Sequence, residues 1–259
     1  MSKFIDKLHN LNKDAVPPMG FKKVEAEPKH LSMLVIAELS GKTETEIKEI
    51  AESGVAAGIL KASGLSASAL AKSLKSCGNL PLGLMLDSDK IASAGKLISG
   101  EIDFVVFDTR VPVTAMEEKI LGKAGKVLRV NPDMEISLLR AVNNVYPLID
   151  AVLIDLRNAH LTLDNLLNCQ RTADIVGQPL VAYVSKSTDV IELAGLRDSG
   201  VKSILVGEDA SASEIKTVIE TIGALPRPVK RKEKGSAVLL PRISAAPDKE
   251  DEGGEDDDD

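Results

Sequence analysis

Two stretches of the chain follow one pattern, Asp103-Phe-Val-Val-Phe-Asp-Thr-Arg110 and Asp150-Ala-Val-Leu-Ile-Asp-Leu-Arg157. Each has an acidic residue, four apolar residues, a second acidic residue and an arginine two positions later. A short apolar run of this kind is typical of a β-strand that is buried on both faces, as in a parallel sheet. The two stretches therefore predict equivalent strands of one repeating fold, each with charged residues where it leaves the core.

Similar apolar runs recur at regular intervals on both sides of these stretches. Together they predict eight strands: Met33–Leu39, Ala57–Lys61, Leu82–Leu86, Phe104–Asp108, Val127–Val130, Ala151–Leu156, Leu180–Val184 and Ser203–Val206. Between the runs, apolar residues recur with helical spacing, as in 44–53 and 188–199. Alternating strands and helices predict an α/β fold, a single (β/α)8 TIM barrel of residues 31–225. The alternative is an open doubly wound sheet, which rarely needs eight evenly spaced units.

The ends of the predicted helices agree with this interpretation. Thr43 precedes Glu46, and Ser211 precedes Glu214, in the spacing of a capping box. Glycine follows several predicted helices, where a left-handed cap residue is favoured. These glycines are Gly54, Gly78, Gly125, Gly177 and Gly200.

The regions on either side of the predicted barrel differ from it in composition. In the extension of residues 1–30, Phe4, Ile5 and Leu8 have helical spacing, which predicts a short helix that covers the bottom of the barrel. Residues 226–259 are rich in charge and end in a run of acids, which predicts a disordered acidic tail. Two interpretations of this tail stay open. It is a solubilising segment, or its apolar part, Val238–Ile243, docks onto a partner protein.

The bulk composition excludes several classes of protein. The net charge is −7, which gives no basic footprint for nucleic acid, and aromatic residues make up only 2%. No apolar run is long enough to span a membrane, and the first residues lack a signal peptide, so we expect a soluble cytoplasmic protein. The cysteines, Cys77 and Cys169, fit no metal spacing, and we expect both to be buried in helices as small apolar residues.

Candidate site residues lie at the carboxyl ends of the strands, where TIM barrels place their active sites. The even-numbered strands end in Lys61, Asp108, Asp155 and Glu208, which we expect to ring the mouth of the barrel. Neighbouring carboxylates can raise a pKa toward general-acid use, and a partly buried lysine can act as a base or Schiff-base nucleophile. Three oxygen ligands could also hold Mg²⁺, although we expect no cofactor. Alternatively, these charges only neutralise one another.

Several motifs together resemble the indole-3-glycerol-phosphate synthases, a family of ribulose-phosphate-binding barrels. The motifs are Ile36-Ala-Glu-Leu, Ile154-Asp-Leu-Arg-Asn-Ala, Val184-Ser-Lys-Ser-Thr-Asp-Val and Leu196-Arg-Asp-Ser-Gly-Val-Lys-Ser-Ile-Leu-Val-Gly-Glu. Their order and spacing match over most of residues 33–215. The resemblance implies that Glu38 matches a family carboxylate and that Asp155 takes the place of a substrate-binding asparagine.

The catalytic residues of that family are not retained. The resemblance places Ser40 and either Met85 or Leu86 where the family has its two catalytic lysines. Arg129 and Lys186 stand where it has glutamates. Where the family binds phosphate after its seventh strand, this chain has Ser187-Thr188 without glycine. Where the family binds phosphate after its eighth strand, this chain has Gly207-Glu208-Asp209, which places two acids near any phosphate. We therefore do not expect the family's activity.

The function expected from the sequence is a divergent barrel that binds a small anionic metabolite, phosphorylated or not, at its mouth. Any reaction would be of the lyase or isomerase kind. The expected catalytic residues are Lys61, Asp108 and Asp155, and the expected binding residues are Glu38, Arg110, Arg129, Arg157, Lys186, Ser187 and Glu208. The alternative is a barrel without catalysis that serves as a binding or scaffold protein, with the tail as its interaction segment.

Overall fold

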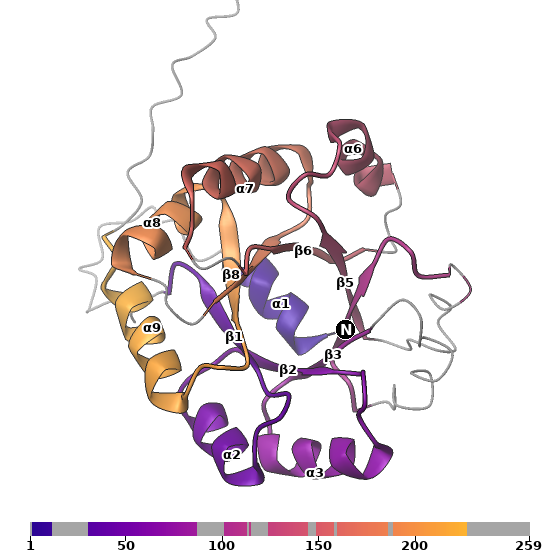
Figure 1. Cartoon of the computed structure of the whole chain (residues 1–259), viewed down its shortest axis with the longest axis vertical. Helices are drawn as coiled ribbons and strands as arrows, with labels where there is room; N and C mark the ends of the chain where they lie inside the picture. The colour runs from indigo at the N-terminus through magenta and orange to yellow at the C-terminus, as the bar shows by residue number, and fades with distance from the viewer. Residues whose placement is uncertain are drawn as a thin grey trace, which may run out of the picture. The chain divides into compact units, whose positions relative to one another are not determined.

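The computed structural model is a closed barrel of parallel strands in the order β1-β2-β3-β4-β5-β6-β7-β8 (Figure 1). The structure describes residues 2–11, 31–86, 101–112, 114, 124–144, 149–157, 160–185 and 189–226. The sheet closes where β1 pairs with β8, with Leu34 opposite Ser203 and Ala37 opposite Val206. This closure confirms the predicted TIM barrel and excludes the open sheet.

Three strands have the predicted bounds, and the other five differ at one or both ends. The strands are β1 (Leu34–Glu38), β2 (Ala57–Lys61), β3 (Leu82–Met85), β4 (Phe104–Asp108), β5 (Gly125–Val130), β6 (Ala151–Asp155), β7 (Leu180–Val184) and β8 (Val201–Val206). The described helices are α1 (Lys3–Asn10), α2 (Glu44–Glu52), α3 (Ala67–Cys77), α6 (Ile136–Asn144), α7 (Leu163–Ile175), α8 (Val190–Asp198) and α9 (Ala212–Ala224). The segments that follow β3 and β4 fall largely outside the described residues.

The helices that follow the strands pack around the outside of the barrel (Figure 1). The predicted capping boxes at Thr43 and Ser211 are both present. Alternate side chains of each strand face these helices and form one apolar layer with them, as Val35 on β1 and Ile204 on β8 do. The side chains between them face inward and form a second apolar cluster, to which Ile36 and Leu205 belong. This alternation decides which residue at each strand end reaches the mouth.

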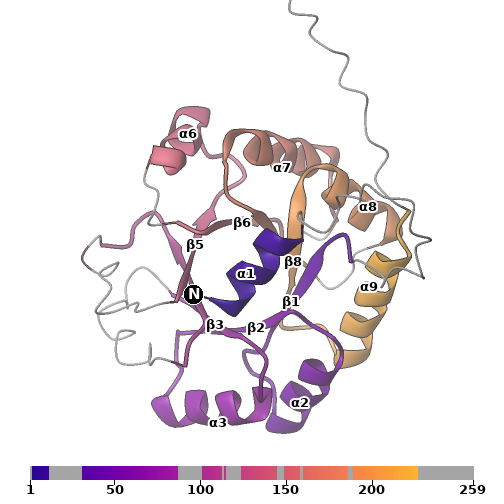
Figure 2. The ribbon, with the colours of Figure 1, turned by 180° about the vertical axis from the view of Figure 1, so that it is seen from behind.

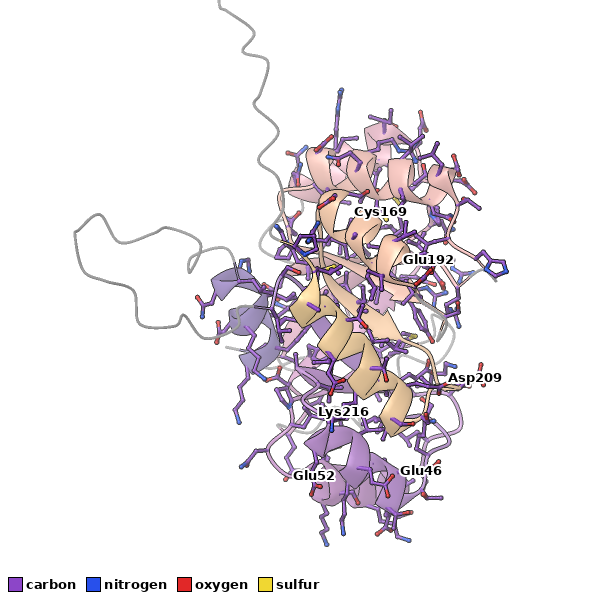
Figure 3. The ribbon with its side chains drawn as sticks, turned by 90° about the vertical axis from the view of Figure 1, so that its left-hand side faces the viewer. Glu46, Glu52, Cys169, Glu192, Asp209 and Lys216 are labelled. Atoms are coloured by element: carbon purple, nitrogen blue, oxygen red, sulfur yellow. The ribbon has the colours of Figure 1, made fainter. Side chains whose placement is uncertain are left out.

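Helix α1 closes the bottom of the barrel, as predicted. Figures 1 and 2 both place it within the ring of strands, and Figure 3 shows it at the end of the barrel opposite Glu192 and Asp209. Phe4, Ile5 and Leu8 are buried in the interior cluster, and the ring of Phe4 lies 4.7 Å from that of Phe104. The barrel therefore has an apolar floor made partly by a helix from outside the repeat.

Asp103, the first residue of the stretch 103–110, binds the start of this helix. Its carboxylate accepts hydrogen bonds from Ser2 Oγ (2.7 Å), Lys3 N (2.7 Å) and Phe4 N (2.9 Å). The first N–H groups of a helix have no partner within the helix and favour a negative charge. Asp103 thus serves the bottom of the barrel, whereas the second aspartate of the stretch, Asp108, serves the top.

The predicted role of Gly125 as a helix cap is wrong. Gly54, Gly78 and Gly200 have positive φ as expected, but Gly125 is the first residue of β5 and has no positive φ. A Cβ atom at Gly125 would lie 2.5 Å from Cγ1 of Ile5. Glycine is needed there because α1 packs against the strand. Gly177 also lacks a positive φ.

Within the described part of the chain, no helix has the length and apolar character to span a membrane. The predicted acidic tail lies outside the described residues, apart from Pro226 at its start.

Candidate functional site at the carboxyl end of the barrel

The charged strand ends point into the mouth because they continue the inward alternation. The interior cluster includes Ile36, Ile59, Val106 and Leu153, and each of them is followed two residues later by an ionisable residue. Those residues are Glu38, Lys61, Asp108 and Asp155. Strand β5 contributes Arg129 in the same way, two residues after the buried Val127. The inward orientation predicted for these strand ends is therefore correct.

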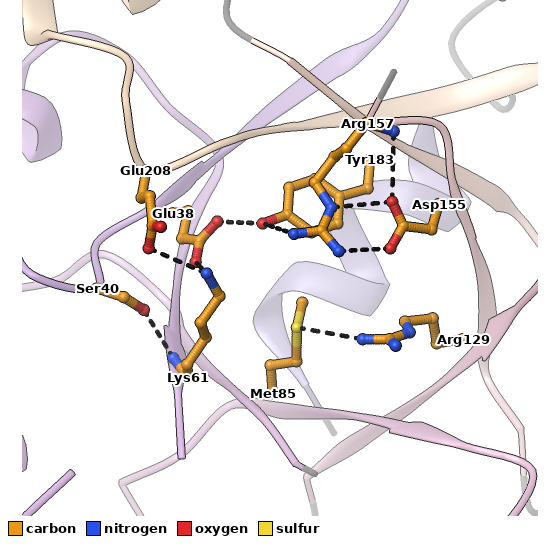
Figure 4. A network of polar contacts seen from close by, with 9 residues as sticks. All are labelled: Glu38, Ser40, Lys61, Met85, Arg129, Asp155, Arg157, Tyr183 and Glu208. Carbon is orange, nitrogen blue, oxygen red and sulfur yellow. Dashed lines mark hydrogen bonds and ion pairs between the residues drawn. The ribbon is translucent and has the colours of Figure 1, made fainter. Parts of the chain in front are cut away.

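Lys61 joins two carboxylates at one side of the mouth (Figure 4). Its Nζ lies 2.7 Å from Glu38 Oε1 and 3.0 Å from Glu208 Oε2. The side chain of Glu38 is 1% exposed, whereas that of Glu208 is 49% exposed. Ser40, which stands where the resemblance places a lysine, accepts a hydrogen bond from the backbone N–H of Lys61 (2.8 Å). The buried charge of Glu38 is thus compensated by a lysine from the neighbouring strand.

Tyr183 on β7 is the second partner of Glu38, and it was not among the predicted site residues. Its hydroxyl donates a short hydrogen bond to Glu38 Oε2. Burial, together with this bond to Glu38, raises the pKa of Tyr183, so the phenol stays neutral. The guanidinium carbon of Arg157 lies 4.2 Å from the centre of the tyrosine ring, a cation–π contact. Tyr183 therefore links the Lys61 side of the mouth to the Arg157 side.

The repeated Asp-x-Arg motif forms the same local clasp on β4 and β6. Arg157 donates to Asp155 from Nε (2.9 Å), from Nη2 (2.7 Å) and from its backbone N (3.3 Å). Arg110 donates to Asp108 from Nη2 (2.8 Å) and from its backbone N (2.9 Å). Arg157 lies over Tyr183, while the side chain of Arg110 is 74% exposed. One sequence motif thus gives one inward and one outward arginine.

The resolved pKa shifts keep this network in its charged form at neutral pH. Burial lowers the pKa of Lys61, but hydrogen bonds to Glu38 and Glu208 outweigh it, and the pKa lies above its usual value. Burial raises the pKa of Asp155, but hydrogen bonds and charge from Arg157, with a smaller effect of Arg129, bring it below its usual value. The hydrogen bond from Lys61 lowers the pKa of Glu208. The predicted rise of a carboxyl pKa is therefore absent at Asp155 and Glu208. Lys61 stays protonated at neutral pH, whereas a general base or a Schiff-base nucleophile must be unprotonated.

Arg129 has a different environment from the other arginines of the mouth. Its Nη1 lies 4.0 Å from the sulfur of Met85, and the guanidinium points across the mouth (Figure 4). Among the described residues, no carboxylate forms a hydrogen bond or ion pair with it, although Asp155 is near enough to feel its charge. The resemblance places Arg129 where the family has a glutamate, and either Met85 or Leu86 where it has a catalytic lysine. The guanidinium of Arg129 therefore lies beside the apolar side chain of Met85.

The structure brings together only part of the predicted ring. Lys61 and Glu208 meet as expected and are joined by Glu38, but Asp108 and Asp155 each turn to the arginine two residues later. Lys186 and Ser187, predicted to bind substrate, lie outside the described residues. Tyr183 follows the inward Val181 by two residues and is the Cα partner of Asp155, but the sequence of β7 is apolar throughout and does not show which of its residues face inward.

Neither a metal cluster nor a reactive thiol is present in the described part of the chain. No three His, Cys, Asp or Glu side chains there lie close enough to hold a metal ion. Cys77 and Cys169 are free and buried in α3 and α7, as predicted. Burial raises the pKa of Cys77 to about 11 and that of Cys169 to about 12, so both thiols are unreactive at neutral pH.

Comparison with known proteins identifies a shared fold. A mutant tryptophan synthase α-subunit from Pyrococcus furiosus is 13% identical, with a TM-score of 0.57 over 73% of this chain and 96% of that one. The homocysteine methyltransferase from Escherichia coli is 12% identical, with a TM-score of 0.55 and the same coverage. A FabK mutant from Thermotoga maritima is 18% identical, with a TM-score of 0.53 over 68% of this chain and 62% of that one.

The chain shares the barrel of these enzymes. At such low identities the likeness extends to the fold alone, because one barrel supports many unrelated reactions. No family model matches the chain, and no curated protein matches it. The function must therefore be argued from the mouth itself.

Proposed function

We propose that the mouth of this barrel binds a small organic anion, with Arg129 as its receptor. The observation that carries the proposal is the contrast between Arg129 and its neighbours. Lys61, Arg110 and Arg157 each have a carboxylate within 3.0 Å, whereas the only hydrogen-bond contact of the Arg129 side chain among the described residues is with the sulfur of Met85. A guanidinium at the mouth of a barrel, with donors that match a planar anion, fits such a ligand.

The charge states favour binding and electrostatic stabilisation over proton transfer. General acid–base catalysis works best with a group whose pKa lies near the working pH. The shifts at Lys61, Asp155 and Tyr183 all lead away from neutrality. In a reaction of the lyase or isomerase kind, Lys61 would stabilise developing negative charge, while Asp108 and Asp155 would position their arginines.

We also infer descent from the ribulose-phosphate-binding barrels, nearest to the indole-3-glycerol-phosphate synthases. The motifs on β1, β6, β7 and β8 support it, as does Glu38 at the position of a family carboxylate. The loss of both catalytic lysines, whose positions correspond to Ser40 and to either Met85 or Leu86, argues against that family's reaction. Ser40 now accepts the backbone N–H of Lys61, and Met85 now contacts Arg129.

A thermal-shift screen against small carboxylic acids, phosphorylated sugars and divalent metals tests the proposal. A ligand at about one hundred times its dissociation constant should stabilise the fold by nearly 3 kcal/mol. We expect a hit with an organic acid that disappears in Arg129→Met and persists in Arg140→Met, a change at an exposed position of α6. A hit that survives Arg129→Met, or no hit in the whole panel, would overturn the proposal.

A scaffold protein without catalysis is the second candidate function. It is favoured by the clasps of Asp108 and Asp155, because charges that neutralise one another need no substrate. In this proposal the protein is intracellular, and residues 226–259 form a separate tail that carries the interaction segment. Full-length chain and a chain ending at residue 225 would be compared in pull-downs. Equal recovery of every partner by both would argue against the scaffold.

A further inference from the structure

We propose that the anion taken by this mouth is a carboxylate and not a phosphate ester. This inference rests on the proposed function and narrows it to small carboxylic acids. Two sets of observations carry it, the charges that surround Arg129 and the way in which the last two helices begin.

The charges of the described mouth already balance. The cations are Lys61, Arg110, Arg129 and Arg157, and the anions are Glu38, Asp108, Asp155 and Glu208. One carboxylate on Arg129 would add a single charge beside a cation that has no carboxylate partner among these residues. A phosphate monoester carries between about −1.5 and −2 at pH 7. Its second charge would face Asp108, the Cα partner of Arg129 on β4, and Asp155 on β6.

Helix α8 offers no free end for a phosphate. Barrels of this fold often hold a phosphate with loops after the seventh and eighth strands and with helix N–H groups. Here Asp189 caps its own helix and accepts the N–H of Val190 (2.7 Å). Glu192 accepts the N–H of Asp189 with one oxygen (3.1 Å) and that of Leu161 with the other (3.2 Å). Two carboxylates thus occupy the place where an anionic ligand would bind.

Helix α9 begins in the same way. Glu214 accepts hydrogen bonds from the backbone N (2.7 Å) and from the hydroxyl (2.8 Å) of Ser211, whose oxygen in turn accepts the N–H of Glu214. Ser211 thus serves the capping box that its spacing to Glu214 predicted. Directly after β8, the exposed Asp209 adds one negative charge beside Glu208, which the balanced set already includes. A phosphate at this side of the mouth would meet these acids, and the two nearby lysines already have partners: Lys42 donates to the carbonyl of Ala210 (2.8 Å) and Lys61 lies 3.0 Å from Glu208.

The test compares two ligands with the same three-carbon skeleton, glycerate and glycerol 3-phosphate. Binding of each is followed by NMR titration at constant ionic strength and pH 7.5 for the full chain and for Arg129→Met. We expect glycerate to bind at least about tenfold more tightly than glycerol 3-phosphate, from the extra Coulomb repulsion of the second charge. Arg129→Met should weaken both.

Asp108→Asn provides the charge control, because it removes a carboxylate beside Arg129 and keeps the shape of the side chain. Electrostatic free energy scales with ligand charge, so the gain in affinity for glycerol 3-phosphate should be roughly the square of the gain for glycerate. Equal gains for both ligands would overturn the electrostatic argument.

The outcomes separate the two proposals. If glycerol 3-phosphate binds as tightly as glycerate or more tightly, and still depends on Arg129, the carboxylate inference is overturned and the proposed function stands. If neither these ligands nor any acid of the screen binds, the proposed function itself fails.

Discussion

The exchange Lys61→Met removes the cation that compensates the buried charge of Glu38. At the 2.7 Å separation of Nζ and Oε1, the gross attraction at an effective dielectric constant of about 20 is about 6 kcal/mol. Desolvation offsets much of this, and loss of one partner of a buried pair usually costs about 3–5 kcal/mol. Because the lysine side chain is 34% exposed and Tyr183 still donates to Glu38, we expect a loss of about 2–3 kcal/mol.

Urea denaturation of Lys61→Met would measure this loss as a change in the free energy of unfolding. The matched control is Lys72→Met, because Lys72 and Glu44 are 3.9 Å apart and both largely exposed, and it should cost less than about 0.5 kcal/mol. Adding Glu38→Gln to Lys61→Met should recover most of the stability, since no buried charge is then left uncompensated. If Lys61→Met is as harmless as its control, the reasoning about the mouth is refuted.

Three further predictions concern single side chains. Tyr183→Phe keeps the ring below Arg157 but removes the donor to Glu38, and should lower the free energy of unfolding in urea by about 1–3 kcal/mol. Phe4→Ala should cost about 3–5 kcal/mol in the same assay; a negligible change would mean that α1 is not part of the cooperative unit. Arg157 outweighs burial and lowers the pKa of Asp155, so this carboxylate stabilises the fold above its ordinary pKa of about 3.9. That stability is lost as the pH falls through the lowered value, so the cost of Asp155→Asn should be largest at pH 7 and shrink below about pH 4.

The fold could be predicted because its pattern is local and repeated. Strands buried on both faces read as apolar runs, and β2, β4 and β7 have the predicted bounds. Gly125 shows where local reading fails. Glycine is required at this position because of the contact with Ile5, a residue far away in sequence, and no sequence pattern near Gly125 indicates this contact.

The mouth was only partly predictable, for a related reason. Charged residues at strand ends mark it, but the sequence does not say which partner each side chain chooses. Asp155 can reach Arg157 two residues away at little cost in chain entropy, and this contact replaces the ring that was expected. Tyr183 was missed because an aromatic residue within an apolar run looks like core on either face of a doubly buried strand.

The floor of the barrel has a consequence for the order in which the chain can fold. Helix α1 precedes every strand that it packs against, and its partners Asp103 and Gly125 emerge from the ribosome much later. At about 5–20 residues per second, that interval is on the order of 5 to 25 s. During this time Phe4, Ile5 and Leu8 have no barrel interior to enter. A nascent chain of this protein thus carries these apolar side chains unburied until the strands that form the interior cluster have been made.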